Sequence, residues 1–369
     1  MKWDWKAVLG IVISVLLLWW VLRDVHFAEV WAEVRHADFR LLAAAVAVAT
    51  GSFFIRALRW KVFLHPLRPG TGLHNRFAAT NIGFMANNLL PVRLGELARS
   101  YAISRTEPVS MSGALGSLVV ERFLDAVIIF ALMLLAVSWP TFPAEATVAG
   151  RPLDQLLLLV LGLVTAGLVG LLVLLLFPRL FLRVVAKLGG YLPSKLETRL
   201  VAVAQAFFEG LGSLRNPRLL AAGLAWTAFL WVWHGVSFWL GFQAFGIDLD
   251  LAAALFVQSL VALGVAIPSA PGFFGTFHAA VRVGLAEVYG VGAGAALAFA
   301  FGYHLGAFIP VTVIGLIYAW YLGVSLRQVD ERRGEMPPAA ATAGGVEGGR
   351  SSAPRKDAAG APEMERPEE

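Results

Sequence analysis

The chain has 369 residues, of which 58% are hydrophobic and 15% are charged, and its mean hydropathy is +0.71. Soluble domains carry about 45–50% apolar and about 25% charged residues, so this composition excludes an ordinary soluble enzyme, a nucleic-acid-binding module and a disordered protein. The formal net charge is +5, and the absence of cysteine excludes disulfides, a thiolate metal site and a cysteine nucleophile.

Six apolar stretches predict an all-α, polytopic membrane protein, because a membrane-spanning helix needs about 20 mostly apolar residues. They run from about Ala7 to Leu22, Leu41 to Leu64, Ser112 to Trp139, Leu156 to Phe177, Leu219 to Phe245 and Ala295 to Leu322. No small-residue cleavage pattern follows the first stretch, which indicates an uncleaved anchor rather than a signal peptide. Pro310 predicts a kink in the last one.

Two further apolar stretches, residues 73–104 and 251–290, are broken by proline and glycine. The breaks are marked by Pro91 and Gly95 in the first stretch and by Pro271, Gly272 and Gly275 in the second. Proline and glycine interrupt the hydrogen-bond ladder of a helix, and the freed backbone groups need protein or water around them at membrane depth. We therefore predict two re-entrant hairpins that enter and leave on the same side; the alternatives are pairs of helices joined by tight turns, or kinked full spans.

The distribution of basic residues predicts the orientation of the chain. With six spans and two hairpins that do not cross, the N-terminus and residues 56–111 and 178–218 fall on the same side and carry most of the Lys and Arg residues. The loops of the other side hold five: Arg23, Arg35, Arg40, Arg151 and Arg282. This asymmetry predicts that both termini are cytoplasmic. Residues 191–215 are expected to form an amphipathic interfacial helix on that face, and residues 327–369 a disordered cytoplasmic tail.

The order of span, span, hairpin and span occurs twice, so we predict a membrane domain over residues 1–326 with halves at about 5–140 and 155–325. Because each half crosses the membrane three times, the second half is inverted relative to the first. Both hairpin tips read P-x-x-x-G followed by a polar residue, at Pro91–Glu96 and Pro271–Thr276. Inverted repeats with broken helices near the midplane are typical of transporters. The alternative is a repeat that merely packs.

Ionisable residues in the apolar stretches are the candidate functional residues, because a charge at bilayer depth is costly without a partner or a role. The candidate substrate-binding residues are Asn87, Asn88, Arg93, Glu96, Arg99, Glu121, Arg122, Asp125, His278 and Arg282. Arginines hold phosphate through forked, charge-assisted hydrogen bonds, so a polar cavity for an anionic group is one interpretation. The other is internal salt bridging that holds the first hairpin to the third span. We expect Arg56 and Arg59, beside Trp60, to reach the cytoplasmic interface and touch lipid phosphates.

No metal or cofactor site is predicted. The histidines do not show the spacing of metal ligands such as H-E-x-x-H, and the sequence contains neither a phosphate-binding G-x-x-x-x-G-K-[ST] loop nor a G-x-S-x-G nucleophile motif.

Four motifs resemble the flippase-like family that includes the transmembrane region of lysylphosphatidylglycerol synthase. They are R-A-L-R-W (56–60), N-N-L-L-P-V-R-L-G-E-L-A-R (87–99), V-E-R-F-L-D (120–125) and I-P-S-A-P-G-F-F-G-T-F-H-A-A (267–280). The resemblance implies a multi-pass inner-membrane protein that moves or handles a lipid across the bilayer, as a stand-alone member without the aminoacyltransferase domain of the synthases. Relatives often carry a P-G-G-L-G-x-x-E pattern at the second hairpin, where this chain has Phe273 and His278.

The leading hypothesis is a lipid translocase, not an enzyme, whose substrate is an anionic phospholipid, a polyprenyl phosphate or a glycolipid. A second hypothesis is a membrane-embedded transferase acting on a lipid phosphate, with Glu96 or Asp125 as base. A third is a non-transporting scaffold for an envelope-lipid biosynthetic enzyme. The expected partners are therefore a membrane lipid with an anionic head group and envelope-lipid enzymes, and no nucleic acid.

Overall fold

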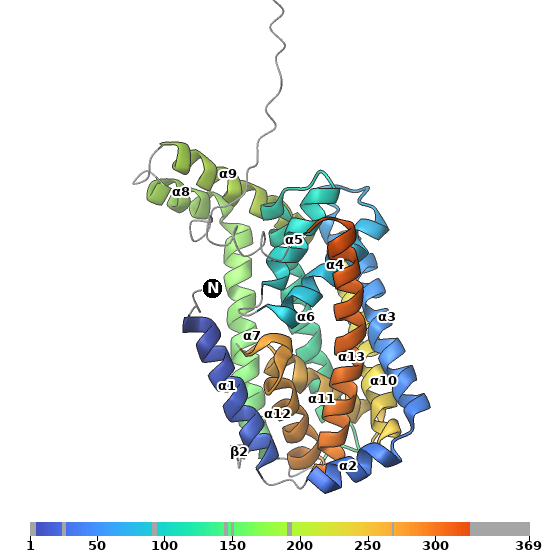
Figure 1. Ribbon diagram of the computed structural model, residues 1–369. Coiled ribbons are helices and arrows are strands. Elements are labelled where there is room, and N and C mark those ends of the chain that lie inside the picture. Colours follow the sequence, from blue (N-terminus) through green and yellow to red (C-terminus); the bar gives the residue numbers. More distant parts are fainter. Residues whose placement is uncertain are drawn as a thin grey trace, which may run out of the picture.

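The computed structural model describes residues 5–23, 27–90, 94–143, 147–148, 151–189, 194–267 and 269–324 (Figure 1). Within them the chain is helical apart from one antiparallel pair of two-residue strands. The elements are α1 Trp5–Leu22, α2 Phe27–His36, α3 Phe39–Leu64, α4 Leu73–Leu89, α5 Gly95–Thr106, α6 Met111–Val137, β1 Thr147–Val148, β2 Arg151–Pro152, α7 Leu153–Leu176, α8 Pro178–Gly189, α9 Ser194–Gly210, η1 Leu211–Arg215, α10 Pro217–Ala244, α11 Leu251–Gly264, η2 Pro271–Phe273, α12 Thr276–Arg282, η3 Val283–Val288 and α13 Ala293–Tyr321. The predicted all-α fold is confirmed.

Each predicted span corresponds to one long helix, with ends shifted by a few residues: α1, α3, α6, α7, α10 and α13. Among the residues that the structure describes, three of these helices are long and apolar enough to cross a membrane: α3, α10 and α13. The α6 helix is equally long but carries Glu121, Arg122 and Asp125. The structure thus supports a membrane-embedded helical protein, while the count of six crossings stays a prediction. Pro310 lies inside α13, which continues through it.

Short amphipathic helices at the two ends of the molecule were only partly predicted. Within the predicted segment 191–215, residues 194–215 form α9 followed by the 3-10 turn η1. The α8 helix precedes them as a second helix that the hydropathy pattern did not separate. The α2 helix was also missed, because its ten residues mix apolar with charged side chains. The predicted tail at 327–369 lies outside the described residues.

Side-chain caps fix where several of the long helices begin. Asp38 accepts hydrogen bonds from the backbone N–H groups of the first turn of α3, and Ser110 does the same at α6. Asn216 caps α10, where Pro217 occupies the first helical position, and Asp250 caps α11. Such caps satisfy N–H groups that have no partner within the helix, and each stabilises its helix by about 1 kcal/mol.

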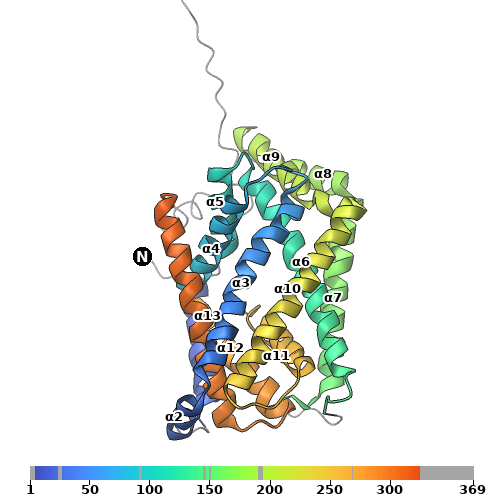
Figure 2. The same ribbon diagram turned by 90° about the vertical axis from the view of Figure 1, so that its right-hand side faces the viewer.

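Two helical pairs occupy opposite ends of the bundle. The α4 and α5 helices lie at the end that also holds α8 and α9, and α11 and α12 lie at the end that holds α2 (Figure 1). The long helices α3, α10 and α13 run past both pairs (Figure 2). The end of α4 and the start of α5, and likewise the end of α11 and the start of α12, therefore point toward the centre of the molecule. Pro91 and Arg93, at the first break, lie outside the described residues.

Close backbone contact at Gly95 holds α4 against α5. A β-carbon at Gly95 would collide with the carbonyl oxygen of Gly83 and with the side chain of Asn87. Asn87 in turn accepts a hydrogen bond from the Gly95 N–H, with 2.7 Å between Oδ1 and N. The glycine of the P-x-x-x-G motif is therefore required by a close approach of two helices.

Replacing Gly95 by alanine is expected to destabilise the protein by about 1–3 kcal/mol, because the two helices must separate to admit the methyl group. The measurement is the melting temperature of the purified protein in detergent. Gly70→Ala is the control, since a β-carbon there meets nothing within 4 Å. Equal melting temperatures for the two variants would contradict this account of the first hairpin.

The second tip is built on left-handed backbone. Gly272 has φ +71° and Gly275 has φ +93°, and Phe273 between them has φ +62°. Glycine adopts such angles without steric cost, so Gly272 and Gly275 allow the sharp turn before α12. The turn rests on α1, where the Ser14 hydroxyl accepts a hydrogen bond from the Ala270 N–H at 2.7 Å.

Each hairpin packs into its own hydrophobic cluster. The cluster around the second hairpin is rich in aromatic side chains, including Phe238, Phe242, Phe256, Phe299 and Tyr303. The cluster around the first contains Trp60, Phe63, Met85, Ile103 and Leu118, among others. The two helical pairs are therefore held by separate sets of apolar side chains.

Candidate functional site

The centre of the candidate site is a pair of buried carboxylates on α6. Glu121 and Asp125 are four residues apart, so they project from one face of the helix. Their exposed fractions are 0% and 3%. A buried carboxylate is stable only with charged or hydrogen-bonded partners, and four helices supply them here: α3, α5, α6 itself and α10.

The first partner is Arg59 of α3, which forms ion pairs with both carboxylates. Its Nη1 lies 2.5 Å from Asp125 Oδ1, and its Nη2 lies 3.0 Å from Glu121 Oε1. Arg59 is completely buried. The prediction that Arg59 reaches the interface to touch lipid is therefore wrong: a nearby pair of carboxylates holds the guanidinium inside the protein.

Arg99 and Arg122 complete the ionic contacts of Glu121. Arg99 Nη1 lies 2.7 Å from Glu121 Oε1, and Arg122 Nη2 lies 2.5 Å from the same oxygen. Arg122 also lies 3.2 Å from Asp125 Oδ2. The guanidinium of Arg99 lies 3.9 Å from the centroid of the Trp60 ring, and Trp60 is fixed by its hydrogen bond to Ser117. One carboxylate oxygen thus faces three guanidinium groups.

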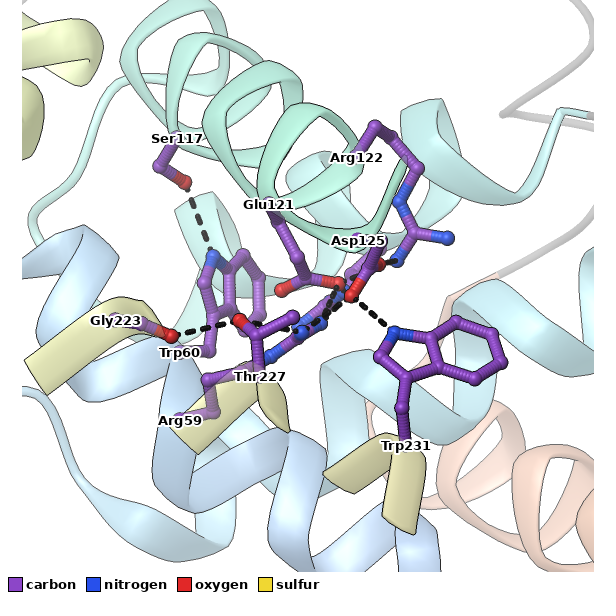
Figure 3. Close-up of polar contacts among 10 residues, drawn as sticks. Arg59, Trp60, Ser117, Glu121, Arg122, Asp125, Gly223, Thr227 and Trp231 are labelled. Atoms are coloured by element: carbon purple, nitrogen blue, oxygen red, sulfur yellow. Dashed lines mark hydrogen bonds and ion pairs between the residues drawn. The ribbon is translucent and has the colours of Figure 1, made fainter. Parts of the chain in front are cut away.

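Two side chains of α10 close the cluster on the remaining side. Trp231 donates its Nε1 hydrogen to Asp125 Oδ1 at 2.9 Å, and the Thr227 hydroxyl accepts from Arg59 Nη1 at 3.2 Å. Thr227 donates in turn to the Gly223 carbonyl oxygen. Figure 3 shows Arg59 and Trp231 converging on Asp125 from two different helices. Forked arginine–carboxylate bonds of this kind fix side-chain orientation as well as charge.

Arg56 is buried without a carboxylate partner. Only 5% of the residue is exposed, yet it forms no ion pair within the described part of the chain, and its Nε and Nη1 atoms have no hydrogen-bond partner there. The guanidinium lies 5.0 Å from the Phe84 ring centroid and 5.7 Å from that of Trp231. Aromatic faces attract a cation but do not neutralise it. The prediction that Arg56 reaches the lipid interface is wrong as well.

A cavity of about 510 Å³ opens beside these residues. It is bounded by the first hairpin, by α3, α6 and α10, and by the end of α11 with the turn that follows it. Its polar lining consists of Arg56, Asn87, Glu96, Arg99, Arg122 and Asp125. Phe273, from the tip of the second hairpin, also lines it. The cavity therefore lies between the tips of the two hairpins, where the sequence predicts a polar site.

Positive charge exceeds negative charge around this cavity. Arginine stays protonated in proteins, so Arg56, Arg59, Arg99 and Arg122 carry four positive charges. Glu121, Asp125 and Glu96 supply at most three negative charges in the same region. Besides the two nitrogens of Arg56, Arg99 Nε and Nη2 lack a hydrogen-bond partner among the described residues. An anionic group in the cavity would balance the charge and accept hydrogen bonds from these nitrogens.

Three of the remaining candidate residues of the first hairpin, Asn87, Asn88 and Glu96, line this cavity or a smaller one beside it. Glu96 and Asn87 line it, and Asn88 donates a hydrogen bond to Thr312 of α13 at 2.8 Å. Asn88 lines a smaller cavity of about 190 Å³ that shares Arg56 and Phe273 with the larger one. The fourth, Arg93, lies outside the described residues.

The candidate residues of the second hairpin lie elsewhere. His278 is fully buried in an aromatic environment, with ring centroids 4.1 Å from Phe301 and 5.2 Å from His304. Within the described chain no hydrogen bond or ion pair joins it to the arginines. Arg282 donates hydrogen bonds to the carbonyl oxygens of Trp20 and Val21 at the end of α1. Unlike Arg99, neither residue lines the 510 Å³ cavity.

Sequence reasoning missed the roles of Arg56, Arg59 and Trp231. Arg56 lies about two helical turns, or about 12 Å, before the end of α3, which is deep for a side chain expected at the interface. That depth could have indicated in the sequence that Arg56 is buried. The sequence contains no such indication for Trp231, because a tryptophan in an apolar helix is equally consistent with packing. No group of three or more His, Asp or Glu side chains among the described residues is arranged to hold a metal ion.

Comparison with known proteins gives a consistent group of relatives. Residues 7–315 match the family described as the lysylphosphatidylglycerol synthase TM region. A UPF0104 membrane protein of Methanothermobacter thermautotrophicus is 25% identical over 319 residues, which cover 83% of this chain and 91% of that protein. Glycosyltransferase AglD of Haloferax volcanii is 24% identical over 352 residues, which cover 89% of this chain but only 56% of that longer protein.

Proposed function

Since this chain belongs to the family of the lysylphosphatidylglycerol synthase TM region, we propose that it is a membrane lipid translocase for lipids with an anionic head group. The observation that carries the proposal is the cavity of about 510 Å³ with a buried arginine, Arg56, that has no carboxylate partner within the described residues. A phosphate is the natural ligand for such a group, because guanidinium binds it through two parallel hydrogen bonds.

The position of the cavity supports movement as well as binding. It touches the tip of each helical pair, and the two pairs approach it from opposite ends of the bundle. In our proposal the halves 5–140 and 155–325 form an inverted repeat of three spans each, with both helical pairs re-entrant. Rocking of one half against the other would then expose the head group to each side in turn. The predicted cytoplasmic location of both termini, in a plasma membrane, is part of the same proposal.

Reconstitution tests the proposal directly. The purified chain is inserted into phosphatidylcholine vesicles that contain phosphatidylglycerol with a fluorescent head group, and an impermeant quencher is added outside. We expect the protected fraction of label to disappear faster than in protein-free vesicles, and the effect to be smaller for a zwitterionic labelled lipid. If folded protein left the protected fraction unchanged, the translocase proposal would be rejected.

The name of one relative, a glycosyltransferase, supports a second candidate function. In this alternative the chain is a membrane-embedded transferase acting on a lipid phosphate. Glu96 is the better candidate base, since Asp125 is held by Arg59, Arg122 and Trp231. Mass spectrometry of lipids from cells lacking or overproducing the protein separates the two functions. A new lipid species that depends on Glu96 would favour the transferase.

A further inference from the structure

A second cavity, almost wholly apolar, lies beside the first. Its volume is about 520 Å³, and its walls are formed by α6, α8 and α9. Apart from Glu96, Ser112 and Arg122, every lining residue is apolar: Leu115, Leu118, Val119, Phe181, Val185, Leu200, Val203, Ala204 and Phe207. Ligand cavities commonly have volumes of about 300–1,000 Å³, so this space is large enough for a hydrocarbon chain.

The two cavities meet at Arg122. Glu96, Leu118 and Arg122 line both of them. The Arg122 side chain is 43% exposed although its guanidinium pairs with Glu121 and Asp125. The boundary between the polar and the apolar space is thus a charged group with free surface. Such a junction matches a molecule that carries an anionic group at one end and an apolar chain at the other.

The apolar cavity reaches the surface of the protein at α8. Phe181 lines the cavity and is 41% exposed, and its neighbours Leu180 and Val184 are exposed as well. Arg179, Arg183 and Lys187 recur every four residues and form a basic stripe on the helix. A short helix with an apolar face and a basic stripe lies in the membrane interface, where anionic head groups gather. The cavity is therefore open where phospholipid acyl chains would be found.

Close glycine contacts fix the wall opposite α8. A β-carbon at Gly116 of α6 would collide with the Phe207 carbonyl oxygen of α9, and one at Gly210 would collide with the Gly113 carbonyl oxygen. The backbones of α6 and α9 are therefore in direct contact at one end of the cavity. This contact keeps α9 beside α6 rather than free in the interface.

We infer that the apolar cavity between α6, α8 and α9 binds one acyl chain of the anionic phospholipid whose head group occupies the arginine-lined cavity. The inference rests on the proposed function and narrows its substrate to a long-chain phospholipid that spans the junction at Arg122. The polar cavity recognises the phosphate, and the apolar cavity holds the chain during the approach from the leaflet beside α8.

Neighbouring valines on α8 provide a matched test. Val185 lines the apolar cavity, whereas Val184 is 48% exposed and does not. The probe is phosphatidylglycerol with a photoreactive acyl chain, in phosphatidylcholine vesicles that contain the full chain; crosslinks are mapped by mass spectrometry. We expect crosslinks on α6, α8 and α9, and loss of most of this labelling for Val185→Trp, because the larger side chain fills space in the cavity that the acyl chain would occupy. Val184→Trp should match the parent protein.

The outcomes separate this inference from the proposed function, because photolabelling does not need transport. Full labelling of folded Val185→Trp, or crosslinks confined to other helices, would overturn the acyl-chain site while the translocase could stand. If an added polyprenyl phosphate abolished the labelling and excess unlabelled phosphatidylglycerol did not, the cavity would not be a site for a phospholipid acyl chain. If Val185→Trp does not fold, Ala204→Phe on α9 fills the same cavity from the opposite wall.

Discussion

Replacing Arg56 by glutamine is expected to lower the rate of anionic-lipid movement by about tenfold to a hundredfold, since a hydrogen bond to a charged group contributes about 1.5–3 kcal/mol. The thermal stability of the protein should not fall. Arg56 forms no ion pair within the described residues, and burial of an unpaired charge is itself unfavourable. The measurements are the vesicle quenching assay and the melting temperature of the same preparation in detergent.

Two further variants make this prediction specific. Arg56→Lys keeps the charge and loses the forked geometry, so its rate should lie between those of the parent and Arg56→Gln. Arg40→Gln removes an exposed arginine near the start of the same helix and should transport normally. A strong loss of stability in Arg56→Gln would show that Arg56 is a structural residue, and normal transport would remove it from the binding site.

Replacing Glu121 by glutamine is expected to destabilise the protein by about 3–5 kcal/mol, because it leaves buried guanidinium groups without their counter-charge. Glu121 contacts Arg59, Arg99 and Arg122 through one oxygen. The variant keeps the volume of the side chain, so the loss would report charge rather than packing. The measurement is the fraction of monodisperse protein that survives a heating series in detergent.

Glu96→Gln is the control for this second experiment. Glu96 lines the same cavity but is not ion-paired in the part of the chain that the structure describes, so its loss should change stability little. If the Glu121 and Glu96 variants lost stability equally, the buried network would not be the structural centre of the site. If Glu121→Gln were as stable as the parent protein, the arginines would have other counter-charges.

Arg59 and Arg56 differ in their partners and therefore in their expected roles. Arg59 is bound by both carboxylates and by Thr227, so its main effect is to join α3, α6 and α10. Arg56, one turn earlier on the same helix, faces the cavity with aromatic neighbours instead. Breaking a buried ion pair is costly, whereas removing an unpaired cation is not. Substitutions three residues apart should therefore have opposite consequences for stability.

The sequence predicted the helices well because each depends on local features. Composition and span length predicted α3, α10 and α13 to within a few residues, and Pro/Gly breaks predicted the interruptions after α4 and after α11. It also predicted that Arg99 and the 121–125 carboxylates belong to a polar site. These features can be read from one segment at a time, since span length and helix interruption depend on neighbouring residues.

Only the tertiary structure decided how the charges are paired. The R-x-x-R spacing of Arg56 and Arg59 is the same whether the side chains face lipid, a carboxylate or a cavity. What separates them is the approach of α6 to α3: it brings Asp125 to Arg59 and leaves Arg56 between Phe84 and Trp231. Helix packing brings together residues far apart in the sequence, and the energy of a buried charge depends on those neighbours. For this reason the sequence predicts which residues are charged within the apolar stretches, and the fold determines which of those charges has no counter-charge among the described residues.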